Sequence, residues 1–204
     1  AKGLEDTALY RHNRLLALNE VGSGCGGTDP AAGVERFHHH NRRTLQRWPH
    51  TMNATSTHDT KRSEDVRARL NLLSELPRHG ARSLRRWSRM NREKKGLLNG
   101  CPVPDPSEEV LLYQTLLAAW PLRAPEVPEF RQRLQAYVIK AAREAKVHTS
   151  WFQPDEAYEK ALISFVEACL DSSGPNEFLG DFLRFQRRVA YHGALNSLAQ
   201  VLLK

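Results

Sequence analysis

The sequence predicts a mainly α protein with little or no sheet. Apolar residues recur at helical spacing through most of the 204 positions. Prolines and glycines divide this pattern into about seven or eight segments of helical length. Only two short stretches, residues 15–21 and 52–57, have the composition of strands. These observations favour a helical subdomain over any sheet-based fold.

Local signals mark where the predicted helices begin and end. Residues 30–47 carry a proline in the first turn and are stopped by Pro49. Residues 60–76 place apolar side chains on one face and are followed by Pro77. Asp105, Pro106 and Glu108 form a capping box at the start of a helix that runs to about residue 120. The other predicted helices cover residues 80–93, 128–146, 154–170 and 174–204.

Composition limits the class of protein. The chain is 40% apolar and 26% charged, which is ordinary for a globular protein. No apolar run approaches the roughly 20 residues of a membrane span. Cys25, Cys101 and Cys169 are far apart and form no CxxC pair, which argues against a disulfide framework and a zinc site. We therefore expect a cytoplasmic location, no membrane contact, no metal and no organic cofactor.

The stretch ATSTHDTKRSEDVRAR at residues 54–69 is the densest polar run of the chain. One interpretation makes Asp59 or Thr60 the N-cap of the following helix, with His58 as a surface histidine. The other interpretation is chemical. A carboxylate at the end of a short strand, just before a helix, lies where α/β barrels place catalytic residues.

Three stretches resemble one enzyme family. They are MNATSTHDTKRSEDVRARLNLLSELP at 52–77, AKGLEDTALYRHNRLLALNEVG at 1–22 and FRQRLQAYVIKAAREAKVHTSWFQPDEAYEKAL at 130–162. The sequence is similar in these stretches to the maltooligosyl trehalose synthases. This family comprises (1→4)-α-D-glucan 1-α-D-glucosylmutases of the α-amylase superfamily, whose catalytic domain is a (β/α)8 barrel.

The resemblance implies an activity and a set of site residues. The family converts the reducing-end α-1,4 bond of a maltooligosaccharide into an α,α-1,1 bond, an isomerase reaction that forms maltooligosyl trehalose. Asp59 matches the third essential carboxylate, in a His-Asp motif after the seventh barrel strand. His58 would hydrogen-bond the same sugar ring. Lys61 and Arg62 would line a neighbouring subsite, and Lys2 would line the site as well.

The resemblance also implies that the chain is an internal fragment. The nucleophile and the acid/base would lie upstream of residue 1, and the eighth strand would follow residue 204. We expect residues 1–76 to derive from the barrel, 77–175 to form a helical insertion subdomain, and 176–204 to flank the barrel. An incomplete barrel with one of three carboxylates predicts an inactive isolated fragment.

Other features allow different interpretations. Residues 78–95 form an Arg-rich helix with Trp87 inside it, which suggests an all-α nucleic-acid-binding module as the alternative function. A solvated face, or one that meets the acidic second half of the chain, explains the same arginines. His38, His39 and His40 point in different directions on a helix and do not converge on one ion. Trp151 and Phe152 are candidates for a sugar-stacking platform. A purely structural helical insertion is a further alternative.

Overall fold

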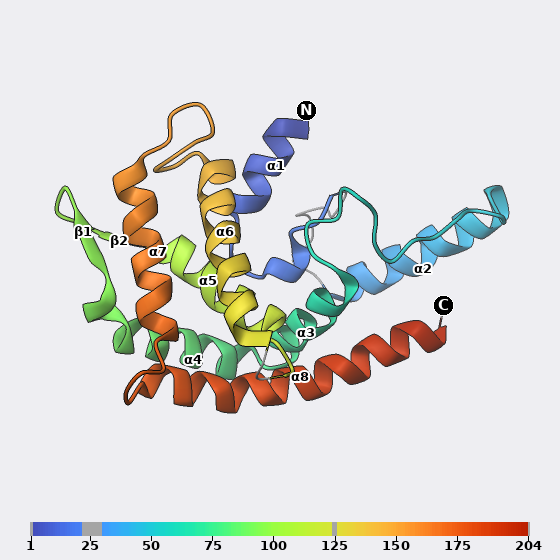
Figure 1. Cartoon of the computed structure of the whole chain (residues 1–204). Coiled ribbons are helices and arrows are strands. Elements are labelled where there is room, and N and C mark those ends of the chain that lie inside the picture. Colours follow the sequence, from blue (N-terminus) through green and yellow to red (C-terminus); the bar gives the residue numbers. More distant parts are fainter. Residues whose placement is uncertain (1, 22–29, 124–125, 204) are drawn as a thin grey trace.

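The structure is a computed structural model that describes residues 2–21, 30–123 and 126–203. Figure 1 shows an assembly of helices with a single small hairpin in this part of the chain, which confirms the prediction of a mainly α fold. The α-helices are α1 (Lys2–Arg11), α2 (Pro30–Arg47), α3 (Glu64–Glu75), α4 (Pro77–Met90), α5 (Pro106–Ala119), α6 (Val127–Ala145), α7 (Glu156–Leu170) and α8 (Glu177–Leu203). The 3₁₀ helices are η1 (Leu16–Leu18) and η2 (Arg92–Lys94), and the strands are β1 (Gly96–Leu98) and β2 (Cys101–Val103).

Three predicted helix starts are wrong by three or four residues, and one of them belongs to the last helix, which was expected from residue 174 and begins at Glu177. The helix expected from residue 60 begins at Glu64, and its N-cap is Ser63 rather than Asp59 or Thr60. Thr60 is instead bonded within a turn, because its hydroxyl accepts from the backbone N–H of Thr57. The basic helix expected from residue 80 begins at Pro77, since proline is well suited to the first position of a helix.

Both predicted strands are absent from the described residues, and the observed hairpin was not expected. Residues 16–18 form η1, and residues 52–57 are irregular. In the hairpin, Gly96 pairs with Val103. Asn99 and Gly100 turn the chain with φ of 51° and 80°. Asn-Gly is the common two-residue turn of a hairpin, and it was overlooked because the flanking strands are so short. Within the described ranges, no segment forms a strand of a barrel.

Trp87 lies at the centre of the main core. Its ring is fully buried and meets Tyr113 and Phe182 edge-on, with centroids 5.6 Å away in each case. Such edge-to-face pairs add to the free energy of burial. The core continues through helices α3 to α8, where Leu72, Leu116, Phe130, Leu134, Phe165, Phe178 and Val189 are also buried. A second cluster joins α1 and η1 to α3, α5 and α6.

The packing of α8 against α3 depends on a glycine. A Cβ added at Gly193 would lie 2.4 Å from Cγ and 2.9 Å from Cα of Arg69. The missing side chain of Gly193 allows α3 and α8 to approach closely, and Arg69 then reaches the carbonyls of Ala118 and Trp120 at 3.0 Å.

The arrangement leaves one part of the molecule uncovered. In Figure 1, α6 and α7 run antiparallel above α8, whereas α2 and the end of α8 project away from the other helices. None of the described side chains of α2 is buried, and Phe37 is 61% exposed. Beyond Gly193, α8 also has no buried residue, and Leu202 is 77% exposed.

Candidate functional site

The His-Asp pair lies in an exposed turn between the irregular segment 52–57 and α3. The backbone N–H of Thr60 donates to the carbonyl of Thr57 at 3.1 Å, and the N–H of Thr57 donates to the Thr60 hydroxyl at 2.7 Å. His58 and Asp59 occupy the two central positions. The side chain of His58 is 89% exposed and that of Asp59 is 36% exposed. The turn therefore exposes His58 to solvent and leaves Asp59 half-buried beside it.

Lys61 and Arg62 point toward the body of the molecule. The Lys61 ammonium contacts Asp6 of α1 at 2.5 Å, and its side chain is only 14% exposed. The guanidinium of buried Arg62 donates to the hydroxyl of Tyr137 on α6 at 2.8 Å. In this structure the two side chains bind protein groups and leave the exposed tip to His58 and Asp59.

Lys2 belongs to α1, but its side chain lies outside the described part of the structure. The predicted site is thus brought together in two parts. His58 and Asp59 share the tip of the turn, whereas Lys61 and Arg62 lie at its base.

Three residues that support the base of this turn were missed at the sequence level. Glu20 accepts hydrogen bonds from the backbone N–H groups of Lys61 and Arg62, at 2.8 Å each. Asp6 and Tyr137 hold the two side chains. Because all three partners are distant in sequence, no local pattern could have revealed them.

A cavity of about 770 Å³ opens beside the base of the turn. Its walls combine aromatic surface from Trp120, Phe130 and Tyr137 with cationic side chains. Aromatic faces with a few polar groups are the usual lining of small-molecule sites. The charged residues of its lining are Lys61, Arg62, Asp65, Arg69, Arg123, Glu126 and Arg133.

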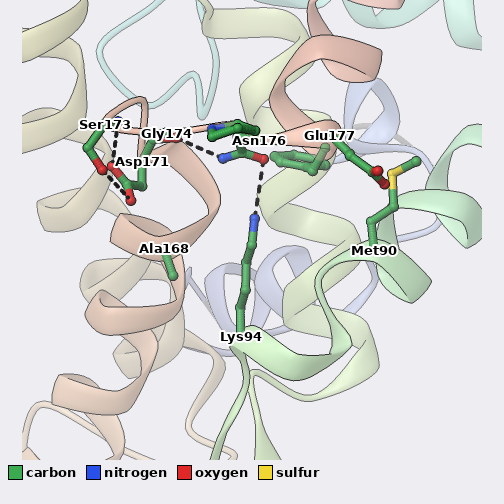
Figure 2. A pocket seen from close by; sticks show the side chains of 10 residues that line it. Met90, Lys94, Ala168, Asp171, Ser173, Gly174, Asn176 and Glu177 are labelled. Carbon is green, nitrogen blue, oxygen red and sulfur yellow. Dashed lines mark hydrogen bonds between the residues drawn. The ribbon is translucent and has the colours of Figure 1, made fainter.

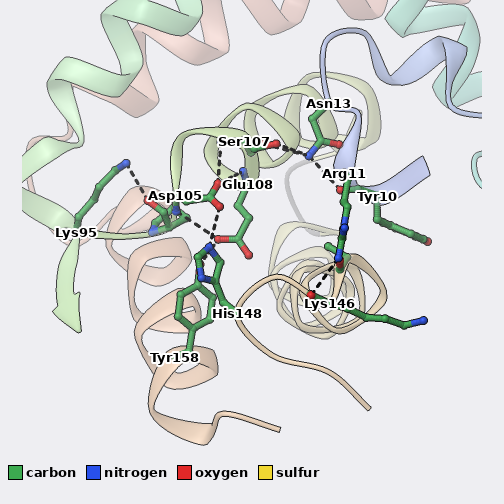
Figure 3. A network of polar contacts seen from close by, with 12 residues as sticks. Tyr10, Arg11, Asn13, Lys95, Asp105, Ser107, Glu108, Lys146, His148 and Tyr158 are labelled. Atoms are coloured by element: carbon green, nitrogen blue, oxygen red, sulfur yellow. Dashed lines mark hydrogen bonds and ion pairs between the residues drawn. The ribbon is translucent and has the colours of Figure 1, made fainter. Parts of the chain in front are cut away.

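Among the described residues, one group has the spacing of metal ligands. One ligand atom each from Asp105, Glu108 and His148 lies within 4.8 Å of the others. Figure 3 shows that these atoms already serve a hydrogen-bonded network. Asp105 caps α5 through the N–H groups of Ser107 and Glu108 and meets His148 at 2.8 Å. The capping box predicted for this helix is confirmed, and the network explains the cluster without an ion.

Tyr158 completes this network and affects its protonation. Its hydroxyl donates to the Glu108 carboxylate, and its ring stacks on His148 with centroids 4.6 Å apart. Burial raises the pKa of Glu108 above its usual value. Burial likewise raises the pKa of Tyr158, and its hydrogen bond to Glu108 acts in the same direction. The tyrosine therefore stays a donor, and the group acts as a structural link between α5 and α7.

A smaller cavity of about 300 Å³ lies between the end of α4 and the turn that leads into α8 (Figure 2). The Lys94 ammonium donates to Asn176 at 3.3 Å. Asn176 in turn donates to the carbonyls of Cys169 and Asp171, at 3.0 and 2.8 Å. These contacts satisfy carbonyls at the C-terminus of α7. The polar groups that line the cavity therefore hold α7 and the following turn together.

The structure removes base stacking by Trp87 from the nucleic-acid alternative. Trp87 was the residue proposed to stack on a base, but its ring has no exposed surface. Its indole N–H donates to Asp181 at 2.7 Å, and Arg86 binds the same carboxylate at 2.5 Å. Arg86 of the Arg-rich helix thus meets an acid from the second half of the chain, whereas Arg82, Arg85 and Arg89 are exposed. Both explanations that the sequence left open apply, each to part of this helix.

The tertiary contacts of Asp181 also control its charge. Burial alone would raise the pKa of Asp181, but hydrogen bonds from Trp87, Arg184 and Arg86 lower it below its usual value. The ionised carboxylate therefore suits this place in the fold, where it ties α8 to α4.

The fold and the turn together define a helical body that presents a His-Asp pair and a cavity with aromatic and cationic walls. Comparison with known proteins finds homologous enzymes. The chain is homologous to the maltooligosyl trehalose synthases, as the resemblance implied.

A Mycobacterium tuberculosis protein assigned as a maltooligosyl trehalose synthase is 36% identical over 183 residues, which cover 88% of this chain and 22% of the relative. A Sulfolobus tokodaii structure of the same description is 36% identical with a TM-score of 0.78, covering 98% of this chain and 26% of the other. The maltooligosyltrehalose synthase of Arthrobacter ramosus is 37% identical with a TM-score of 0.72, covering 98% and 23%. No family model matches the sequence.

The chain therefore spans about a quarter of the length of the relatives it matches. None of the helices in the described ranges is long and apolar enough to cross a membrane.

Proposed function

We propose that this chain forms part of a cytoplasmic intramolecular transglucosylase that converts the reducing-end α-1,4 bond of maltooligosaccharides into an α,α-1,1 bond. The homology to maltooligosyl trehalose synthases over nearly the whole chain supports this proposal. The position of half-buried Asp59 in this turn, next to exposed His58, is the structural observation that carries it. Maltooligosaccharide is the proposed substrate, no organic cofactor is required, and the product serves trehalose formation.

Asp59 is proposed as the third carboxylate of the catalytic site. Retaining chemistry uses a nucleophile and an acid/base whose carboxyl groups are about 5–5.5 Å apart. A third carboxylate that binds sugar hydroxyls lowers the barrier only if these contacts strengthen in the transition state. His58, at the tip of the same turn, is placed to bind the same ring.

Lys61, Arg62 and Lys2 are proposed to line the neighbouring part of the site. Lys61 and Arg62 border the cavity beside the turn, which supports a place near an adjoining sugar unit even though both side chains are largely buried. We expect this chain alone to be inactive. The resemblance assigns it the third carboxylate, Asp59, but neither the nucleophile nor the acid/base.

We further propose that residues 77–175 act as a helical insertion that helps exclude water, with residues 1–76 derived from the barrel and 176–204 flanking it. Water would hydrolyse a glycosyl-enzyme before the glucose is rejoined. Trp151 and Phe152 are 50% and 92% exposed and lie between α6 and α7, where they could stack on a sugar. Arg143 lies 5.0 Å from the Trp151 ring centroid and holds one face of that indole.

The test is Asp59→Asn in the longer enzyme that contains this segment, with loss of reducing ends from maltopentaose as the readout. Asparagine keeps the size of the side chain and removes its charge. The control is Asp171→Asn, another aspartate in a short turn. We expect Asp59→Asn to lower kcat by at least about 100-fold, as for loss of one group that stabilises transition-state charge. Near-normal turnover with an intact fold would refute the role of Asp59.

A further inference from the structure

Residues 13–20 are firmly attached to the core. Gln114 of α5, which is 1% exposed, accepts from the N–H of Leu16 at 2.9 Å and donates to the carbonyl of Asn13 at 2.9 Å. Asn13 in turn donates to the Ser107 hydroxyl at 3.0 Å (Figure 3). These contacts fix residues 13–16 on the helix that forms the centre of the molecule.

Asn19 extends this attachment to the residue before Glu20. Its side chain is 2% exposed and donates to the carbonyls of Leu9 and His12 at 2.7 and 2.6 Å. A buried amide with two such bonds fixes the local backbone, because breaking either bond would leave a desolvated donor. The backbone at Glu20 is therefore held in a fixed position.

From that position, the carboxylate of Glu20 reaches the base of the His-Asp turn. Its Oε2 accepts from the N–H of Lys61 and its Oε1 from the N–H of Arg62, both at 2.8 Å. Hydrogen bonds from backbone amides to a carboxylate are shorter and stronger than bonds between neutral groups. Two parallel bonds also fix orientation, because rotation or displacement of the turn would lengthen at least one of them.

We propose that Glu20 is a positioning residue, which holds the turn bearing Asp59 in its catalytic place through the amides of Lys61 and Arg62. This inference rests on the function proposed for Asp59. Glu20 contacts the main chain, so its effect passes through the backbone of residues 59–62. The side chains of Lys61 and Arg62 bind Asp6 and Tyr137. The hydrogen bonds from their backbone N–H groups to Glu20 therefore do not depend on the charges of these side chains.

The geometry explains why a rigid support is required at this point. Asp59 is separated from the first residue of α3 by four positions that lie outside the helix. The last of them, Ser63, caps α3: its side chain accepts from the N–H of Val66 and its carbonyl from the N–H of Arg67. Without Glu20, the amides of residues 61 and 62 would rely on solvent, and Asp59 would sample a wider range of positions.

The experiment is Glu20→Gln in the longer enzyme, with Glu75→Gln as the matched control on an exposed part of α3. Glutamine keeps one carbonyl acceptor but turns an NH₂ group toward the second amide. We expect kcat to fall by about 10- to 100-fold, the range associated with a misplacement of about 1 Å. KM should change much less, because a displaced Asp59 affects transition-state contacts most.

A second readout needs no activity. In the 204-residue chain, Glu20→Gln should speed hydrogen exchange at the amides of Lys61 and Arg62, while amides in the middle of α5 keep their protection. Glu20→Asp keeps both oxygens on a shorter stem and should give an intermediate loss of kcat. If Glu20→Gln fails to fold, Glu20→Asp decides the question by the same two measurements.

The outcomes separate this inference from the proposed function. An inactive Asp59→Asn enzyme together with a fully active Glu20→Gln enzyme would overturn the positioning role and leave Asp59 catalytic. An active Asp59→Asn enzyme would overturn the catalytic role of Asp59, and with it the catalytic purpose of Glu20. Unchanged exchange at Lys61 and Arg62 would show that the two hydrogen bonds do not restrain the turn.

Discussion

Two regions of the molecule both carry apolar side chains but differ in what these side chains contact. The packed body consists of α3 to α7 and residues 177–193 of α8, and it encloses Trp87 and Phe182 completely. The open face consists of α2, residues 48–57 and residues 194–203, and it has no buried residue among those described. Exposed apolar surface of this kind marks an interaction site, so we expect the open face to pack against further protein.

The largest expected difference between the two regions comes from matched phenylalanines. Phe182 is fully buried in α8, whereas Phe37 on α2 is 61% exposed. Phe182→Ala should lower the free energy of unfolding by about 3–5 kcal/mol, because it leaves a cavity in the core. Phe37→Ala should change it by less than about 0.5 kcal/mol. Urea unfolding of both variants measures this, and equal losses would contradict the division into two regions.

A second pair of changes tests the boundary of the packed body within one helix. Gly193→Ala places a methyl group against the Arg69 backbone and should cost about 1–3 kcal/mol. Nothing lies within 4 Å of a Cβ at Gly180, so Gly180→Ala should stabilise the protein by about 0.4–1 kcal/mol. Thermal unfolding of both variants gives opposite shifts in Tm if the close contact between α3 and α8 is correct.

An ion pair of the packed body predicts a pH dependence. Glu159 accepts two hydrogen bonds from Arg143, at 2.7 and 2.6 Å, and this lowers its pKa. The stabilisation is therefore complete above the usual glutamate pKa of about 4.3 and is lost as pH falls through the lower folded value. Glu159→Gln should lower Tm at pH 7, and its difference from the unchanged protein should shrink toward pH 3.

The matched control for this pH effect is Glu75→Gln, which changes an exposed glutamate at the end of α3. Its Tm should follow that of the unchanged protein at each pH. A Glu159→Gln deficit that stays constant between pH 7 and pH 3 would show that lost packing, rather than the charge of Glu159, causes the destabilisation.

The smallest effect on stability is expected on the open face. Leu198 and Leu202 are 55% and 77% exposed. Replacing both by serine should leave Tm nearly unchanged but weaken any concentration-dependent self-association of the chain, because it divides the apolar surface. Sedimentation velocity over a range of concentrations measures this. Equal association of the variant and the unchanged chain would argue against the open face as a contact surface.

Sequence reasoning succeeded where short-range interactions decide the structure. The helix at residues 30–47 and the capping box of Asp105 and Glu108 agree with the structure, because each depends on residues a few positions apart. It failed at residue 60, where the spacing of apolar residues suggested a longer helix. There, the bonds of Glu20 to Lys61 and Arg62 compete with helical geometry.

The candidate site divides in the same way. The resemblance identified His58 and Asp59 as site residues, and their role remains a prediction. It did not reveal that Lys61 and Arg62 face the body of the protein, or that Trp87 is buried. An aromatic residue in an arginine-rich helix has the same local pattern whether its ring faces water or the core, so burial had to come from the packing of α4 against α8.

The sequence by itself determined the helical class, the start of α5 at the capping box of Asp105 and Glu108, and the polar stretch that contains Asp59. Only the tertiary structure decided which groups support that stretch. Glu20 lies 41 and 42 positions from the amides that it binds. The capping residues of a helix meet because the first turn itself brings them together, whereas Glu20 meets Lys61 only after α1, η1 and α5 have packed. That packing depends on the shape and burial of the whole core, which no local pattern encodes.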